Sequence, residues 1–200
     1  MASITKTLAT TQSGWTGDTA SGGGKQYNDN ICRYLSSPAG VGTTFYAYTY
    51  GFGFIGTETI DGVYVQLHAG GTQGSPEVQS MYCYIINGLT KRGVGRGALL
   101  DTDVASCSGA LYAQYGSSVE KWGLTQANLN TYVRDSSNFG ISIQNSVATQ
   151  GTWWVDGFSI TVYYTPVPTG WDYTINEVSS SNLGAVNEVL RANIAEINKT

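Results

Sequence analysis

The most constraining feature of this sequence is a pair of alternating apolar runs between Phe139 and Tyr164. In the first run, the apolar residues 139, 141 and 143 alternate with small or polar ones. In the second run, residues 158, 160, 162 and 164 are apolar or aromatic and their neighbours are polar or tyrosine. Because successive side chains of a strand point to opposite faces, each run predicts a strand with one buried face. The polar segment 145–151 between them predicts that the two strands form an antiparallel hairpin.

The composition favours an all-β protein. The 200 residues include 26 glycines and 14 tyrosines, and only 12% are charged, which is typical of a turn-rich sheet protein. We therefore predict an antiparallel, jelly-roll-like β-sandwich built around the hairpin, with a partly helical C-terminal extension. The predicted divisions are an N-terminal arm at 1–14, the sandwich at 15–165, and a linker with an assembly tail at 166–200.

Other segments predict further strands and core residues. Aromatic residues share one parity from Tyr46 to Phe54, opposite small residues, which predicts that the aromatic side is buried. The segment 81–86 is apolar on both faces, which predicts a cover on both sides. Trp122 and Phe139 are expected to be core anchors. Thr125 is expected to cap a short helical turn.

Charge and hydropathy exclude several classes of protein. A net charge of −4 argues against a nucleic-acid-binding surface. The polar N-terminus lacks the apolar core of a signal peptide, and no 18-residue apolar run occurs, so we expect synthesis in the cytosol and no membrane insertion. Three cysteines without metal-binding spacing fit either one disulfide with a free thiol or, as we favour, three reduced buried residues, at positions Cys32, Cys83 and Cys107.

Catalytic chemistry has few candidates in this sequence. The single histidine, His68, falls on the outward parity of a predicted strand, so we expect it to be exposed. Without a second base, a Ser-His-Asp or Cys-His arrangement needs His68 itself, and zinc is disfavoured for the same reason. No carboxylate pair stands out for glycoside hydrolysis. We therefore expect no enzyme, no metal and no cofactor.

The glycine-rich segment 91–97 carries three cations, Lys91, Arg92 and Arg96. Its spacing does not match a phosphate-binding loop, so we expect a hairpin tip. These cations either contact an acidic partner surface or are simply solvated. Asp101 and Asp103 offer two oxygens to calcium, a weaker alternative because further ligands are not evident.

The last thirty residues repeat with a period of eleven, after Pro166 and Pro168 end the final strand. Eleven residues make three helical turns at about 3.67 residues per turn, so a helix would carry the repeated apolar positions as one stripe. Such a short amphipathic segment is marginally stable alone and needs a packing partner. The predicted assembly stripe consists of Ile175, Val178, Leu183, Val186, Val189, Ile194 and Ile197.

Several motifs together resemble a known class of protein. They are Ile60-Asp61-Gly62-Val63, Lys121-Trp122-Gly123, Asn138-Phe139-Gly140-Ile141, and Val155-Asp156-Gly157 followed by 160–165. This series resembles a β-sandwich domain of tailed-bacteriophage virion proteins, and the terminal Ile-Asn-x-Val repeats resemble short tandem tails of phage structural proteins. The resemblance covers about residues 12–200. Glu177 and Glu188 depart from it, since such repeats often carry glycine there, and they favour helix.

The resemblance implies a structural virion component, either a capsid decoration or a fibre subunit, that assembles through its tail. It further implies a homotrimer that contacts other virion proteins and, in one version, host-surface glycans. The alternative is a carbohydrate-binding module that uses exposed Tyr and Trp rings. The C-terminal repeat favours the virion protein, because a free sugar-binding module has no need of it.

Overall fold

A computed structural model describes residues 1–7, 11–13, 16–17, 33–35, 44–71, 78–101, 112–145 and 153–166. The chain divides into two compact units, Met1–Pro166 and Val167–Thr200, and the described residues all belong to the first. The predicted stripe at 175–197 therefore lies outside the described residues, as do Cys32, Cys107 and Asp103. The described elements are β1 Ala2–Lys6, β2 Thr11–Ser13, β3 Thr16–Gly17, β4 Arg33–Leu35, β5 Thr44–Tyr48, β6 Thr59–Gly71, β7 Val78–Asn87, β8 Thr90–Asp101, β9 Tyr112–Gly116, α1 Gln126–Arg134, β10 Phe139–Asn145 and β11 Trp153–Thr165.

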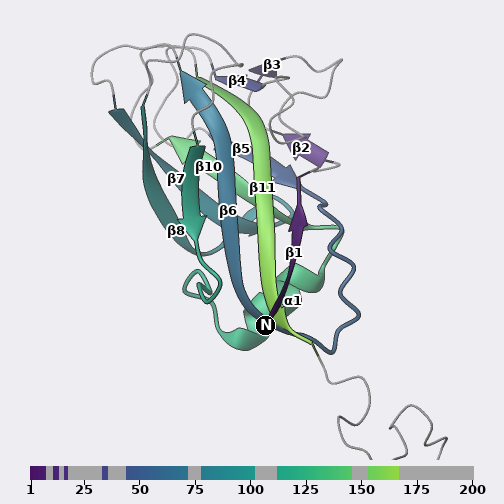
Figure 1. Cartoon of the computed structure of the whole chain (residues 1–200). Coiled ribbons are helices and arrows are strands. Elements are labelled where there is room, and N and C mark those ends of the chain that lie inside the picture. Colours follow the sequence, from purple (N-terminus) through teal and green to yellow (C-terminus); the bar gives the residue numbers. More distant parts are fainter. Residues whose placement is uncertain are drawn as a thin grey trace, which may run out of the picture. The chain divides into compact units, whose positions relative to one another are not determined.

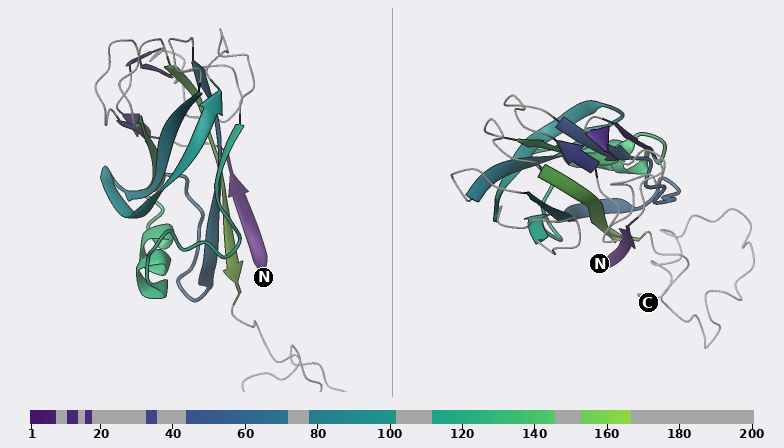
Figure 2. Two further views of the ribbon diagram at one scale, coloured as in Figure 1. Left: turned by 90° about the vertical axis from the view of Figure 1, so that its left-hand side faces the viewer. Right: turned by 90° about the horizontal axis from the view of Figure 1, so that it is seen from above.

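These strands form the two layers of a β-sandwich (Figures 1 and 2). The first sheet has the order β3-β4-β11-β6-β9, and β1 also pairs with β11. The second sheet has the order β2-β5-β10-β7-β8, and the pairings within both sheets are antiparallel. From β4 to β11 the chain alternates between the sheets, except for the β7–β8 hairpin. The predicted all-β antiparallel sandwich is confirmed. Its jelly-roll-like character stays a prediction, and the predicted helical part of the C-terminal extension lies outside the described residues.

The core lies between the inner faces of the two sheets. The predicted inward residues of β10 and β11, including Phe139 and Phe158, are buried, except Tyr164, which is partly buried against the core. Phe158 of the first sheet stacks on Phe45 of the second, with ring centroids 6.1 Å apart. Trp122 is also fully buried, so the prediction of two core anchors, Trp122 and Phe139, is confirmed.

The predicted hairpin of β10 and β11 is wrong, although both strands exist. Strand β10 pairs with β5 and β7 in the second sheet, whereas β11 pairs with β4, β6 and β1 in the first. Alternation in a sequence specifies which face of a strand is buried, but it does not specify the neighbouring strand. The two apolar faces therefore meet across the core.

The aromatic run from Tyr46 to Phe54 also differs from its prediction. Within β5, Phe45 and Ala47 are the buried residues, and Tyr46 and Tyr48 are half-buried on the outer face. The backbone then leaves the strand at Thr49, whose φ is 65°. Because this left-handed residue resets the alternation, the later aromatics of the run, Tyr50 and Phe52, are buried.

Helix α1 is held against the start of β6 at one end of the sandwich. Helix α1 begins after Thr125, whose side chain accepts a hydrogen bond from the Asn128 amide, as predicted for a cap. Asn130 of this helix accepts a hydrogen bond from the Ile60 amide at the start of β6, and Gln126 donates one to the Ile60 carbonyl.

The predicted N-terminal arm contains two strands, β1 and β2, one in each sheet. Within the described residues, no helix is long and apolar enough to cross a membrane.

Candidate functional site

The glycine-rich segment 91–97 is part of strand β8 and is not the expected hairpin tip, which lies at Gly88-Leu89. Its glycines make room for neighbouring groups. A Cβ atom on Gly93 would lie 2.2 Å from the carbonyl oxygen of Trp122, and one on Gly95 would lie 2.5 Å from the Tyr84 ring. The glycines therefore let a loop and an aromatic ring approach the β8 backbone.

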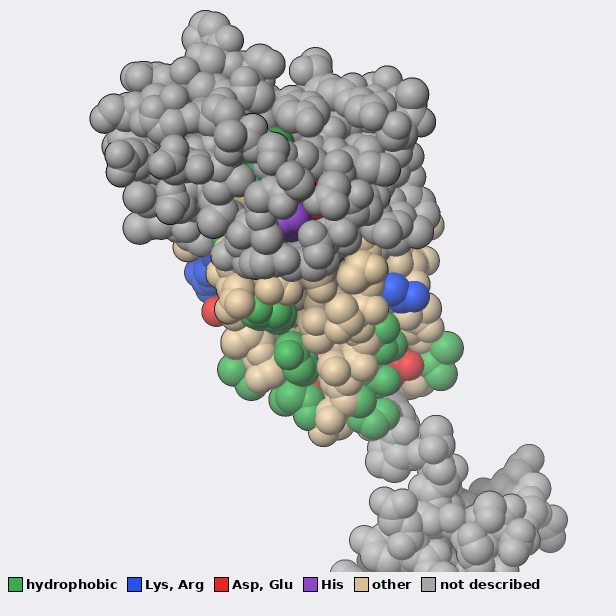
Figure 3. Space-filling model, turned by 45° about the horizontal axis from the view of Figure 1, so that its top comes forward, with side chains coloured by type: hydrophobic (Ala, Val, Ile, Leu, Met, Phe, Trp, Pro, Cys, Tyr) green, Lys and Arg blue, Asp and Glu red, His purple; other side chains and the backbone are tan. Residues whose placement is uncertain are grey.

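The three cations of this segment have different intramolecular partners. Arg96 donates to Glu120 Oε1 at 2.7 Å, and the Arg92 guanidinium lies 4.9 Å from the centroid of the Tyr132 ring on α1. Lys91 instead reaches across the outer face of the second sheet. On the face shown in Figure 3, the Lys and Arg side chains lie apart on its two sides.

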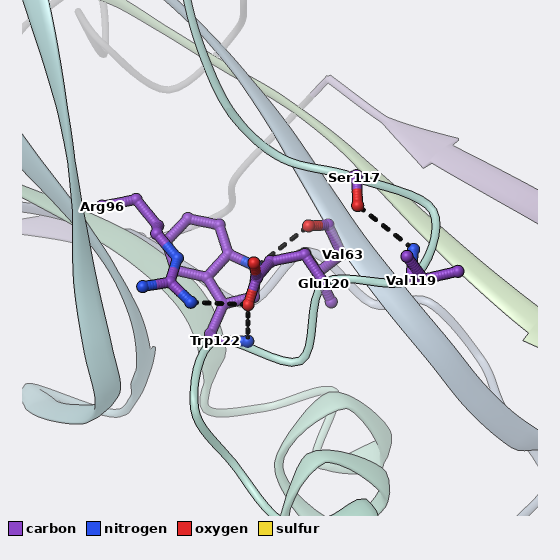
Figure 4. Close-up of polar contacts among 6 residues, drawn as sticks. All are labelled: Val63, Arg96, Ser117, Val119, Glu120 and Trp122. Carbon is purple, nitrogen blue, oxygen red and sulfur yellow. Dashed lines mark hydrogen bonds and ion pairs between the residues drawn. The ribbon is translucent and has the colours of Figure 1, made fainter.

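The Arg96–Glu120 pair joins strand β8 to the loop that contains Glu120 and Trp122 (Figure 4). Glu120 Oε1 also accepts from the backbone N–H of Trp122 at 2.7 Å. The Trp122 indole donates to the Val63 carbonyl on β6 at 2.9 Å, while its own carbonyl accepts from the Val94 amide on β8 at 2.7 Å. Trp122 thus joins the two sheets, which explains the Lys121-Trp122-Gly123 motif as a structural one.

Lys91 is the cation that faces a candidate binding surface. Its Nζ donates to Gln144 Oε1 and to Thr44 Oγ1, and it lies 4.6 Å from the centroid of the Tyr84 ring. Partial burial lowers the pKa of Lys91, because desolvation disfavours the ammonium form. Its hydrogen-bond acceptors Gln144 and Thr44 are neutral, so a negatively charged ligand would be favoured beside the ammonium group.

Four tyrosines lie on the same outer face of the second sheet as Lys91, and we call the set the tyrosine face. The strand registers place Ser142 of β10 opposite Tyr46 on one side and Tyr84 on the other. Tyr82 is 41% exposed, and its ring centroid is 6.4 Å from that of Tyr84. The tyrosine face consists of Tyr46, Tyr48, Tyr82 and Tyr84, together with Lys91, Ser142 and Gln144.

Small residues of β10 separate the two tyrosine-bearing strands. Gly140 lies opposite Tyr48, where a Cβ atom would be 2.4 Å from the tyrosine Cβ. Ser142, whose strand neighbours are Tyr46 and Tyr84, is fully buried, and its Oγ has no hydrogen-bond partner within the described structure. A buried hydroxyl without a partner is uncommon in proteins, since desolvation is then uncompensated.

The prediction that segment 81–86 is covered on both faces is met only in part on this outer face. Ile86 is fully buried although it lies on the outer parity of β7, whereas Tyr82 is 41% exposed. The predicted cover over both faces of this strand is therefore incomplete in the single chain.

His68 is buried, which contradicts the expected exposure. A bulge in β11 between Val155 and Gly157 adds Asp156 opposite His68. Asp156 Oδ2 lies 2.6 Å from His68 Nδ1, both side chains are about 99% buried or more, and the Trp154 ring meets the imidazole edge-on at 5.7 Å. The sequence signal was Asp156-Gly157 inside a strand, which is typical of a bulge. Complete burial suits a structural pair.

The remaining predictions concern the cysteines and metal binding. Cys83 is buried with a free thiol, as expected for that cysteine. Asp101 ends β8, and its side chain is outside the described residues, so calcium binding stays a prediction. Among the described residues, no group of three or more His, Cys, Asp or Glu side chains is placed to hold a metal ion.

The sequence matches no protein-family model and no curated protein.

Proposed function

We propose that this chain is a non-catalytic accessory protein of a phage virion, a capsid decoration or fibre subunit. The sandwich presents an outer surface, and residues 171–200 mediate assembly into a homotrimer or attachment to other virion proteins. The observation that carries the proposal is the division of the chain after Pro166, because the eleven-residue apolar repeat falls in the separate C-terminal unit. An exposed apolar stripe of this length favours association.

Virion membership can be tested by quantitative mass spectrometry of purified particles of the phage that encodes the chain. The proposal predicts a fixed copy number that is a multiple of three. Absence of the chain from the purified particles contradicts the proposal.

The assembly role has its own test in the full chain. Replacing Val186 and Val189 by Asp places two charges in the proposed apolar contact, so the trimer should dissociate or detach from the particle. The Ser179→Asp, Ser180→Asp variant adds the same charge to a polar part of the segment and should assemble normally. Equal assembly by both variants contradicts the proposal.

Carbohydrate binding is the second candidate, and the tyrosine face favours it. A tyrosine ring is rigid and has an apolar surface next to a polar hydroxyl, which suits contact with the mixed surface of a sugar. The two candidates are compatible, since a virion accessory protein can also bind host-surface glycans.

A further inference from the structure

We infer that the tyrosine face binds an acidic saccharide, with the sugar on Tyr82 and Tyr84 and its carboxylate at Lys91. This inference rests on the carbohydrate-binding candidate and specifies its ligand class and residues. It is independent of whether residues 171–200 assemble the protein.

The shape of the surface comes from the alternation of small and aromatic residues. Tyr46 and Tyr84 stand on either side of Ser142, on strands two positions apart in the sheet, and alternate strands are separated by about 9–10 Å. Gly95 allows the Tyr84 ring to lie against the backbone of β8. Apolar ring faces are thus held at fixed positions along one side of the sheet, where the C–H face of a pyranose can stack.

The charge of the surface favours an anion. Strands β5, β7 and β10 contain no charged residue, so Lys91 from β8 supplies the positive charge among the described side chains of the tyrosine face. Its neighbours Gln144 and Thr44 are neutral acceptors, and among the described side chains no carboxylate pairs with the ammonium group. A ligand carboxylate complements this charge through a charge-assisted hydrogen bond.

Ser142 is an independent sign of a binding site. Its Oγ is fully buried and lacks a partner in the described structure. The side chains that cover this oxygen must move aside for a sugar hydroxyl to reach it. A buried hydroxyl that serves only packing is not stabilised by its oxygen. A hydroxyl used in binding gains a hydrogen-bond partner when the ligand binds.

The test is isothermal titration of the full chain with matched saccharide pairs. One pair is 3′-sialyllactose and lactose, and the other is trigalacturonate and its methyl ester. We expect saturable binding of at least one acidic probe, at least ten-fold tighter than its neutral partner. The Lys91→Met variant should remove this preference, and Ser142→Ala should weaken binding several-fold without lowering the melting temperature.

The ring contacts need a control on the opposite sheet. Tyr82→Ala removes the most exposed ring of the tyrosine face and should weaken binding at least ten-fold, whereas Tyr163→Ala, on the first sheet, should leave it unchanged. Thermal melts verify that each variant is folded. The inference is overturned if neither acidic probe binds, if charged and neutral partners bind equally, or if Tyr163→Ala weakens binding as much as Tyr82→Ala. Tighter binding of an acidic peptide than of either acidic sugar would also overturn it. None of these results alters the mass of the assembly, so failure here differs from failure of the proposed virion role.

Discussion

Trp122 shows how a single residue closes this sandwich. Its backbone φ is 57°, unusual for a residue other than glycine, and its side chain is fully buried. Its amide donates to Glu120 within the loop. Its carbonyl and its indole link the loop to β8 and to β6, respectively. These contacts compensate the backbone conformation, which costs on the order of 1 kcal/mol.

Trp122→Ala should lower the free energy of unfolding by about 3–5 kcal/mol, because it removes a large buried ring and leaves a cavity. The neighbouring exposed Lys121→Ala is the control and should change stability by less than about 0.5 kcal/mol. Chemical denaturation measures both. A loss below about 1 kcal/mol for Trp122→Ala would place the ring outside the core.

Cys83 should resist modification in the folded protein. Burial raises the pKa of its thiol well above the ordinary value, and the thiolate is the reactive form. Iodoacetamide at pH 8 should therefore alkylate Cys83 only after denaturant is added, and peptide mass spectrometry can locate the product. Rapid native-state alkylation at this cysteine would show that the strand β7 core opens readily.

Glu120 should contribute a pH-dependent part of stability. Its hydrogen bond from Arg96, with a further one from the Trp122 amide, lowers the pKa of the carboxyl in the folded state. The stabilisation is therefore fully present above the unfolded pKa of about 4.3 and is lost as the pH falls through the lower folded pKa. Wild type should exceed Glu120→Gln in unfolding free energy by up to about 1 kcal/mol at pH 7, and less below pH 4, since the pair is partly exposed. A difference that is constant between pH 7 and pH 3 would refute this role.

At the scale of elements, strand β8 and the loop that contains Trp122 fit each other through glycines. Gly93 faces the Trp122 carbonyl, and Gly123 faces the Val94 side chain, so each segment removes a Cβ where the other approaches. The glycine content of 91–97 thus has a packing cause, although the sequence alone suggested a hairpin tip.

Gly93→Ala should be more destabilising than Gly53→Ala. Both glycines have positive φ, 67° and 73°, so both variants incur the cost of a left-handed alanine, about 1–2 kcal/mol. Only at Gly93 would the added Cβ also meet a backbone oxygen, 2.2 Å away, whereas nothing lies within 4 Å of a Cβ on Gly53. The difference between the two unfolding free energies isolates the close approach, and equal values would contradict it.

At the scale of the whole molecule, the buried faces of β10 and β11 were predictable and their partner strands were not. Alternation identified most inward residues of these two strands, because burial of one face imposes that pattern. It could not show that these strands belong to opposite sheets. His68 was misplaced because one bulge residue, Asp156, supplies the buried partner. The tyrosine face was missed because Thr49 changes the parity of the aromatic run.

The C-terminal unit is the part of the account on which the proposed function depends most. The repeat predicts an apolar stripe from Ile175 to Ile197, whereas the sandwich up to Pro166 is a compact unit with its own core. We therefore expect that the sandwich folds without the assembly segment, so that the two parts of the chain can be separated.

The most direct test is the mass of the full chain and of a 1–166 fragment by size-exclusion chromatography with light scattering. We predict that the full chain has three times the 21.3 kDa mass of one chain. The fragment should remain folded, with a cooperative thermal transition, and should have the mass of a single fragment chain. A full chain that is monomeric and absent from virions, or a fragment that keeps the trimer, would contradict assembly through residues 171–200.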